Sequence, residues 1–370
     1  SQLGSTPMRL AEELEGTNAG LIYTSITDAL DLREKKFSTA IQGVGIKSYA
    51  DVRAFRDSWT SLRGDIQQAE LEASAMSKLK VETTTDSITE LFRHLGIVEQ
   101  FDPDYIIHNQ TEEQQAGITS LAIAVNPPHV NGVIFNYPKG ARGAGSGQTA
   151  HELAHMAYGM YAPENGTYAE KFGITGTANE TMAFLIESLF SNRRWLYHVY
   201  GMSEQESNLI ASRSQLGDEL FLREYVGGLG FQLELERMER SLEGGIYTQE
   251  GDFKPEVYAA FRSSLGKAYA GRLQLSDDDL RSRYSKFLMP KLEYLIAFAA
   301  SEFLSEYLEE RWGKEWFENP EAGDLLKGVM KDLHVKGIEE VLSGLPHPYG
   351  SSRHFNESNY TSLIQVRYQM

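Results

Sequence analysis

The sequence predicts a mostly helical α+β protein in which a small β-sheet precedes the most distinctive helix. Apolar residues recur at three- and four-residue spacing along most of the 370 residues, which is the period of amphipathic helices. Between about residues 104 and 136 the pattern changes to short β-prone runs, which Pro127-Pro128 and Asn131-Gly132 separate. The third observation is the segment 151–155, His-Glu-Leu-Ala-His, which follows the last of these runs.

The same patterns predict each element in chain order. The first hundred residues read as a helical lobe, with helices over 25–41, 49–79 and 85–95. Strands are predicted over 105–107, 121–125 and 132–135. The region from 178 to 342 is almost entirely helical in pattern, with helices over 178–200, 204–240, 255–275, 277–288 and 292–312, and shorter pieces after 321. Gly-rich joints such as Gly227-Gly228 and Gly244-Gly245 punctuate this region.

These elements predict three successive parts of the chain. An N-terminal helical lobe is expected over 1–100 and a main domain over 101–345, which holds the small sheet and the His-Glu-Leu-Ala-His segment. Residues 346–370, rich in Ser, Asn, Tyr and His, are expected to form a C-terminal tail.

The two histidines of the segment are spaced to bind one metal ion. Side chains at positions i and i+4 of a helix stack one turn apart, so His151 and His155 can both reach one tetrahedral Zn²⁺ at about 2.0–2.1 Å. Glu152 is then free to face a metal-bound water and act as general base. Residues 139–147 are rich in glycine and predict a flexible lead-in, so that the helix is expected to start near Gln148-Thr149.

A catalytic zinc site of this class needs a third protein ligand. The metzincin pattern, with a glycine and a third histidine after the motif, is excluded because Tyr158 and Tyr161 occupy those positions. Glu180 lies 25 residues after His155 on a helix predicted over 177–190. We therefore take Glu180 as the candidate third ligand.

Glu187 shares the helix face of Glu180 and is a candidate partner for a ligand histidine. Carboxylates that accept a hydrogen bond from a metal-bound imidazole orient the ring. The alternative for Glu187 is an ordinary exposed helical glutamate. The alternative for Glu180 is a carboxylate at a helix N-terminus, with Asn179 or Thr177 as the cap.

The segment 180–187, Glu-Thr-Met-Ala-Phe-Leu-Ile-Glu, resembles the helix that follows the zinc helix in the thimet oligopeptidase and oligoendopeptidase F family of gluzincins. Segments that are similar to the C-terminal helices of that family are 294–308, Trp312-Gly313, 325–327 and 338–342. The resemblance extends from about Gly132 to Leu345 at low identity. It implies a zincin-like helical catalytic domain with one Zn²⁺ per chain, held by the two histidines and Glu180, and a peptide substrate.

The chain departs from the family at the groups that hold the substrate carbonyl. Ala154 stands where the family usually has glycine, which is a small change. The family places a histidine and a tyrosine in the region that corresponds to 287–293, and neither is present there. Tyr294 is the candidate for binding the oxyanion, and its alternative is a tyrosine packed on a helix face. Other candidates are Tyr284, His347, Tyr349, His354 and Tyr360.

The strand before the metal helix is a candidate contact for a substrate. An exposed strand edge can pair with an extended peptide through backbone groups alone. The candidate segment is Val133–Asn136. The alternative is a core strand paired on both sides, because a short apolar run does not reveal which edge is free.

Composition excludes several classes of protein. The net charge of −17 and the lack of clustered Lys and Arg argue against a nucleic-acid partner. With no cysteine, disulfides and cysteine ligands are excluded, so a metal must be held by His and carboxylate, which suits a catalytic zinc. No apolar run of 18 or more residues predicts a transmembrane segment. A soluble protein is expected, cytoplasmic or exported after loss of a signal, and its oligomeric state stays open.

The sequence therefore predicts a zinc metallopeptidase of the gluzincin type that hydrolyses oligopeptides or unstructured segments, with Glu152 as general base. Carboxypeptidase-like rather than endopeptidase activity is compatible with the same ligands. A second hypothesis is a catalytically silent protein of the same fold that binds zinc and peptide. A third is a zinc hydrolase that acts on a substrate other than peptides.

Overall fold

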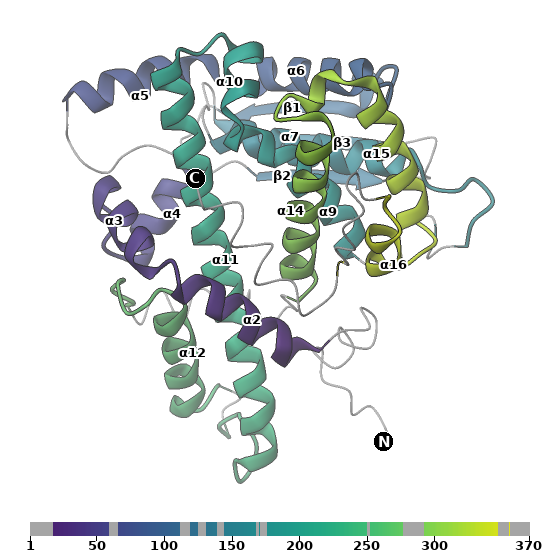
Figure 1. Ribbon diagram of the computed structural model, residues 1–370. Coiled ribbons are helices and arrows are strands. Elements are labelled where there is room, and N and C mark those ends of the chain that lie inside the picture. Colours follow the sequence, from purple (N-terminus) through teal and green to yellow (C-terminus); the bar gives the residue numbers. More distant parts are fainter. Residues whose placement is uncertain are drawn as a thin grey trace. The chain divides into compact units, whose positions relative to one another are not determined.

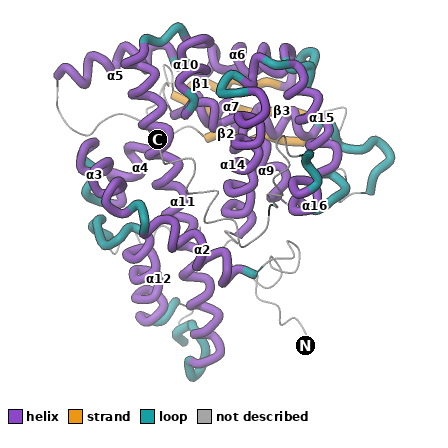
Figure 2. Tube along the Cα trace, in the orientation of Figure 1, coloured by secondary structure: helices purple, strands orange, loops and turns teal. Residues whose placement is uncertain are grey.

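The computed structural model describes residues 18–58, 66–111, 119–124, 131–138, 144–167, 170, 176–249, 252–276, 292–346 and 355. These residues are mostly helical and include a small sheet, which confirms the predicted fold class (Figure 2). The chain divides into two compact units. Unit 1 comprises Ser1–Arg53, Leu216–Ala299 and Asn356–Met370, and unit 2 comprises Ala54–Gln215 and Ala300–Phe355. The boundaries 1–100, 101–345 and 346–370 stay a prediction.

The residues before the sheet form helices, as the apolar spacing predicts. They are α2 (Ala19–Asp31), α3 (Glu34–Val44), α4 (Tyr49–Ser58), α5 (Ile66–Lys78) and α6 (Val81–His94) (Figure 1). The predicted helix over 25–41 is two helices, α2 and α3, which Leu32 and Arg33 separate. Helix α2 begins after its cap Asn18, whose side chain accepts a hydrogen bond from the Leu21 N–H. The second ends at Gly45, where a φ of 86° favours glycine.

The small sheet holds three strands in the order β1-β3-β2. They are β1 (Ile106–Thr111), β2 (Thr119–Ala124) and β3 (Asn131–Pro138), with β3 parallel to β1 and antiparallel to β2. The sheet precedes the His-Glu-Leu-Ala-His helix, as predicted. The proposed free edge at Val133–Asn136 is wrong, because these residues pair with β1 on one side and with β2 on the other. The buried Val133 and Phe135 are core residues of a central strand.

Helix α7 (Ala144–Gly159) carries the two histidines and packs against β2, β3, α6 and α9 (Gly176–Glu187). It begins five residues before the predicted Thr149. Glycine has a low helix propensity, which is why the sequence predicts a loop there. In the structure Gly145 and Gly147 are buried, and the Thr149 hydroxyl donates to the Gly145 carbonyl at 2.7 Å. Packing therefore outweighs the intrinsic preference of this segment.

The later helices agree with the predicted pattern in most of their bounds. They are α10 (Arg193–Tyr200), α11 (Glu204–Ser241), α12 (Pro255–Ala268), α14 (Leu292–Trp312), α15 (Pro320–Leu333) and α16 (Ile338–Ser343), with short 3₁₀ turns η1 (Pro103–Tyr105), η2 (Ser188–Ser191) and η3 (Trp316–Glu318). The predicted helix over 178–200 is interrupted because Asn192 caps α10. The predicted helix over 255–275 ends at Ala268, and 277–288 lies outside the described residues.

The helix predicted over 204–240 is confirmed as α11, which continues through Gly227, so that this glycine is not a joint in the chain. A Cβ at this position would lie 2.8 Å from Cδ2 of Leu265 on α12. Glycine therefore permits close approach of the two helices. Gly244 and Gly245, with φ of 71° and 73°, lie just after the end of α11 at Ser241, where the positive φ favours glycine.

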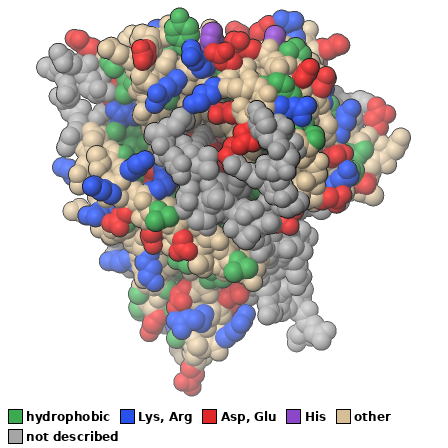
Figure 3. Space-filling view, in the orientation of Figure 1, with side chains coloured by type: hydrophobic (Ala, Val, Ile, Leu, Met, Phe, Trp, Pro, Cys, Tyr) green, Lys and Arg blue, Asp and Glu red, His purple; other side chains and the backbone are tan. Residues whose placement is uncertain are grey.

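The described surface carries both signs of charge. On the face drawn in Figure 3, Lys and Arg side chains are interspersed with Asp and Glu. Among the described helices, none combines the length and the apolar content needed to span a bilayer.

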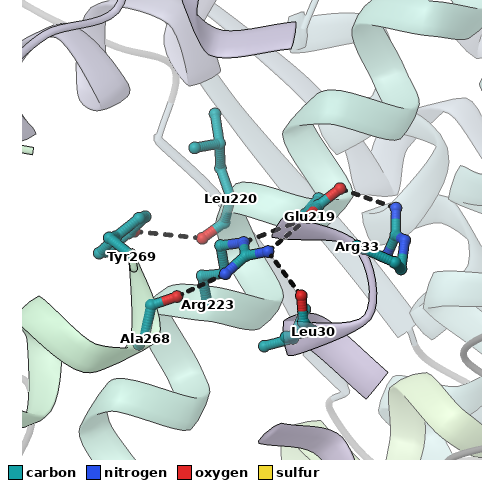
Figure 4. A network of polar contacts seen from close by, with 7 residues as sticks. All are labelled: Leu30, Arg33, Glu219, Leu220, Arg223, Ala268 and Tyr269. Atoms are coloured by element: carbon teal, nitrogen blue, oxygen red, sulfur yellow. Dashed lines mark hydrogen bonds and ion pairs between the residues drawn. The ribbon is translucent and has the colours of Figure 1, made fainter. Parts of the chain in front are cut away.

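A buried guanidinium joins three helices inside unit 1 (Figure 4). Arg223 on α11 is 1% exposed and donates to the carbonyls of Leu30 at 3.1 Å and Ala268 at 2.7 Å. These carbonyls lie at the C-terminal ends of α2 and α12, where backbone acceptors lack the partners they have inside a helix, although the Leu30 carbonyl also accepts from the Arg33 N–H at 3.1 Å. Glu219 balances the charge at 2.9 Å and also accepts from Arg33 at 2.7 Å.

We expect Arg223→Met to lower the free energy of unfolding by about 3–5 kcal/mol, because it removes the donor to the Ala268 carbonyl and leaves part of the buried charge of Glu219 without a partner. Urea unfolding followed by circular dichroism measures the change. The matched control is Arg237→Met on the same helix, whose exposed ion pair with Glu234 should not affect the unfolding midpoint. Equal midpoints for the two variants would contradict a structural role for Arg223.

Candidate metal centre

Helices α7 and α9 bring three predicted ligands together within unit 2. His151 and His155 lie one turn apart on α7, and Glu180 lies in the first half of α9. One ligand atom from each of the three lies within 4.8 Å of the others. This group can therefore bind a metal ion.

Both imidazoles direct Nε2 toward the same carboxylate. Nε2 of His151 lies 3.3 Å from Oε2 of Glu180, and Nε2 of His155 lies 3.7 Å from Oε1. The two rings stand nearly perpendicular, with centroids 4.7 Å apart. All three side chains are largely buried, at 10–15% exposure.

The other ring nitrogen of each histidine is held by an acceptor. Nδ1 of His151 lies 3.0 Å from Oε2 of Glu187, and Nδ1 of His155 lies 2.7 Å from Oδ1 of Asn179. A hydrogen on Nδ1 that is donated to these oxygens leaves the Nε2 lone pair available to a metal. Glu187 therefore has the position predicted for the partner of a ligand histidine.

The residues present fit a zinc ion. Apart from its ion-pair contact with Nε2 of His151 at 3.3 Å, the buried Oε2 of Glu180 makes no hydrogen bond within the described part of the chain, and a cation would compensate its charge. Two imidazole nitrogens and one carboxylate oxygen are donors that Zn²⁺ accepts. Three protein ligands leave one position of a tetrahedral set open, which is typical of catalytic rather than structural zinc sites.

The carboxylates hold a proton on His151 when no metal is bound. Burial acts to lower the pKa of His151, but the contacts and charges of Glu180 and Glu187 outweigh it and raise the pKa to about 10. Burial and the charge of His151 lower the pKa of His155. Burial acts to raise the pKa of Glu180, and the neighbouring histidines outweigh it and lower that pKa. The site is therefore electrostatically suited to a cation.

Glu152 is also buried, at 7% exposure, on the helix that carries both histidines. Gln148, one turn earlier, donates from Nε2 to Oε1 of Glu152 at 2.7 Å. A carboxylate that is hydrogen-bonded in this way keeps a fixed rotamer. The structure thus holds the predicted general base in one orientation.

Tyr294 lies in unit 1, and the ligand group lies in unit 2. Its ring packs against Tyr225, with centroids 5.1 Å apart. The role of Tyr294 in binding an oxyanion stays a prediction. The other sequence candidates, Tyr284, His347, Tyr349, His354 and Tyr360, lie outside the described residues.

Sequence reasoning missed contacts made by three residues of the site. The sequence indicates Asn179 only as a helix cap, and in the structure its side chain bonds His155. It indicates Gln148 only as a helix start, and in the structure the side chain of Gln148 bonds Glu152. Phe184 packs edge-on against His151, with ring centroids 5.3 Å apart. No spacing within α9 signals the bond of Asn179, because adjacent helical residues do not share a face and the contact depends on how α7 and α9 cross.

Comparisons with known proteins support the fold. Protein-family models and curated proteins give no match to this sequence. Among solved structures, the chain is similar to a protein from Chlamydophila abortus described as a "putative peptidase", with a TM-score of 0.51 and 11% sequence identity. The similarity covers 93% of this chain and 55% of that protein, so this chain spans about half of its length. At this identity the likeness concerns the fold alone.

Zinc binding should release about one proton near pH 7.5, because the metal replaces the proton that His151 holds below its pKa of about 10. For the same reason the apparent affinity should rise with pH between about pH 7 and 9. Titration calorimetry in buffers of different ionisation enthalpy counts the protons. His198→Gln, a change of an exposed histidine, should leave the count unaltered. Binding without proton release would contradict the protonated state of His151.

Proposed function

We propose that this protein is a zinc-dependent peptidase in which His151, His155 and Glu180 hold one Zn²⁺ and Glu152 is the general base. The observation that carries the proposal is the arrangement of the two imidazoles. Each turns Nε2 toward Glu180 and has Nδ1 bonded to an acceptor on α9. A chance pair of surface histidines would not be buried, oriented by partners and aimed at one carboxylate.

When bound, Zn²⁺ supplies Lewis acidity and lowers the pKa of water toward about 7. The protein groups perform the proton transfers. Glu152 takes a proton from the attacking water and delivers it to the nitrogen of the leaving group. The leaving group then departs as a neutral amine instead of as an anion. Gln148 keeps the Glu152 carboxylate in place for both transfers. The buried site limits competing proton exchange with solvent.

The substrate class rests on two lines of support. The segment 180–187 resembles the gluzincins of the thimet oligopeptidase and oligoendopeptidase F family, which implies oligopeptides or unstructured segments. The protein of similar fold from Chlamydophila abortus is described as a "putative peptidase", and this chain spans about half of its length. Tyr294 remains our candidate for stabilising the oxyanion.

A silent zinc- and peptide-binding protein is the second candidate function. The absence of the family's histidine and tyrosine pair from 287–293 favours it. The burial of Glu152 and its hydrogen bond to Gln148 favour the enzyme, because a protein without catalysis has no use for an oriented base. Carboxypeptidase-like activity would use the same metal and base, and it would differ from endopeptidase activity in cleaving the last peptide bond of the substrate rather than an internal one.

Glu152→Gln should reduce peptide hydrolysis by about 10²–10⁴-fold while zinc content stays at one ion per chain, because the change removes the base but no ligand. Turnover of a quenched-fluorescence peptide library, with mass spectrometry of the products, measures the loss. Products that differ from the substrate by one C-terminal residue identify a carboxypeptidase, and internal cuts identify an endopeptidase.

Glu164→Gln, at an exposed position shortly after α7, is the matched control and should keep full activity. A chelator should abolish wild-type turnover and added zinc should restore it. Turnover that survives in Glu152→Gln would contradict the mechanism. Bound zinc without cleavage of any peptide would favour the silent protein or a hydrolase for another substrate.

A further inference from the structure

We infer that Asn179 is a positioning residue of the metal centre, which orients His155 for metal binding without adding charge. The inference rests on the proposed function, because it concerns the same zinc site. It assigns different partners to the two ligand histidines. His151 is bonded to a carboxylate, and His155 is bonded to a neutral amide.

The geometry of Asn179 is that of a direct partner of the ring. Its Oδ1 lies 2.7 Å from Nδ1 of His155, shorter than the 3.0 Å between Glu187 and His151. His155 is 10% exposed, so little water competes for that nitrogen. Accepting the Nδ1 hydrogen fixes the tautomer in which Nε2 is the metal ligand.

The position of Asn179 in α9 argues against a capping role. The helix begins at Gly176, so Asn179 is its fourth residue, and its side-chain oxygen reaches across to α7. It directly precedes the candidate ligand Glu180. One turn of α9 therefore supplies both a ligand to the metal and the residue that orients another ligand.

The neutral amide has an electrostatic consequence. Glu180 and Glu187 already bring two carboxylates to a site for a dication, and both contact His151. An aspartate in place of Asn179 would make the ring of His155 more basic and would bind the metal more tightly. It would also make the centre more negative, and a more negative centre stabilises developing negative charge less well. Asn179 thus orients the ring and preserves the Lewis acidity of the ion.

Two substitutions at this position separate orientation from charge. Asn179→Leu keeps the approximate size and removes the acceptor, and zinc affinity should fall by about 10–100-fold. Asn179→Asp keeps the acceptor, so affinity should equal or exceed that of the wild type. In the Asp variant kcat should fall while KM changes little, because ground-state contacts with a peptide are not altered. Zinc affinity is measured by competition with a chromophoric chelator, and the apo melting temperature by circular dichroism.

Asn192→Leu is the matched control. Asn192 caps α10 in the same unit, with its side-chain oxygen bonded to the N–H groups of Arg194 and Trp195. This variant should lower the apo melting temperature and leave zinc affinity unchanged, which is the signature of a purely structural asparagine.

Wild-type zinc affinity in Asn179→Leu would overturn the inference. If Asn179→Leu does not fold, Asn179→Asp decides. A zinc affinity of Asn179→Asp below that of the wild type would also overturn the inference. Failure of the wild-type protein to bind zinc would instead refute the proposed function, so the two failures are distinguishable.

Discussion

The contact between α7 and α9 is the constraint on which the candidate centre depends. Neither helix alone can hold a metal ion, since α7 supplies two imidazoles and α9 supplies the carboxylate that completes the set. The same contact supplies the acceptors for both Nδ1 atoms, because Asn179 and Glu187 lie on α9 as well. A change in the crossing of the two helices would therefore displace the candidate ligand Glu180 and both acceptor side chains together.

Sequence reasoning found the parts of the centre that depend on local spacing. The four-residue interval between His151 and His155 predicts that they share a helix face. The seven-residue interval from Glu180 to Glu187 predicts the same for these two residues. The structure brings the two faces together. The bond between Asn179 and His155 depends on how two helices cross, which no interval within one helix encodes. The same limit explains the error at β3, because strand order is a property of the whole sheet.

Glycine gave the least reliable local signals. Near the start of α7 and at Gly227 the sequence predicted loops or joints, and both segments are helical. In each case a buried contact decides: Gly145 and Gly147 are buried, and Gly227 lies against Leu265. A missing side chain has two uses, conformational freedom and close approach, and the sequence does not distinguish them. The positive φ of Gly244 and Gly245, like that of Gly45, corresponds to the first use.

The strongest argument for catalysis is the combination of an incomplete ligand set with an oriented base. A structural zinc site is closed by four protein ligands, and the described residues offer a group of three. The position left open is where a substrate or water can bind, and it would serve no purpose in a site that only stabilises a fold. Glu152, one residue from the first ligand, is buried and fixed by Gln148. Burial of a carboxylate is costly, and selection for stability alone would replace it with an apolar residue. The cost is understandable if the carboxylate transfers protons.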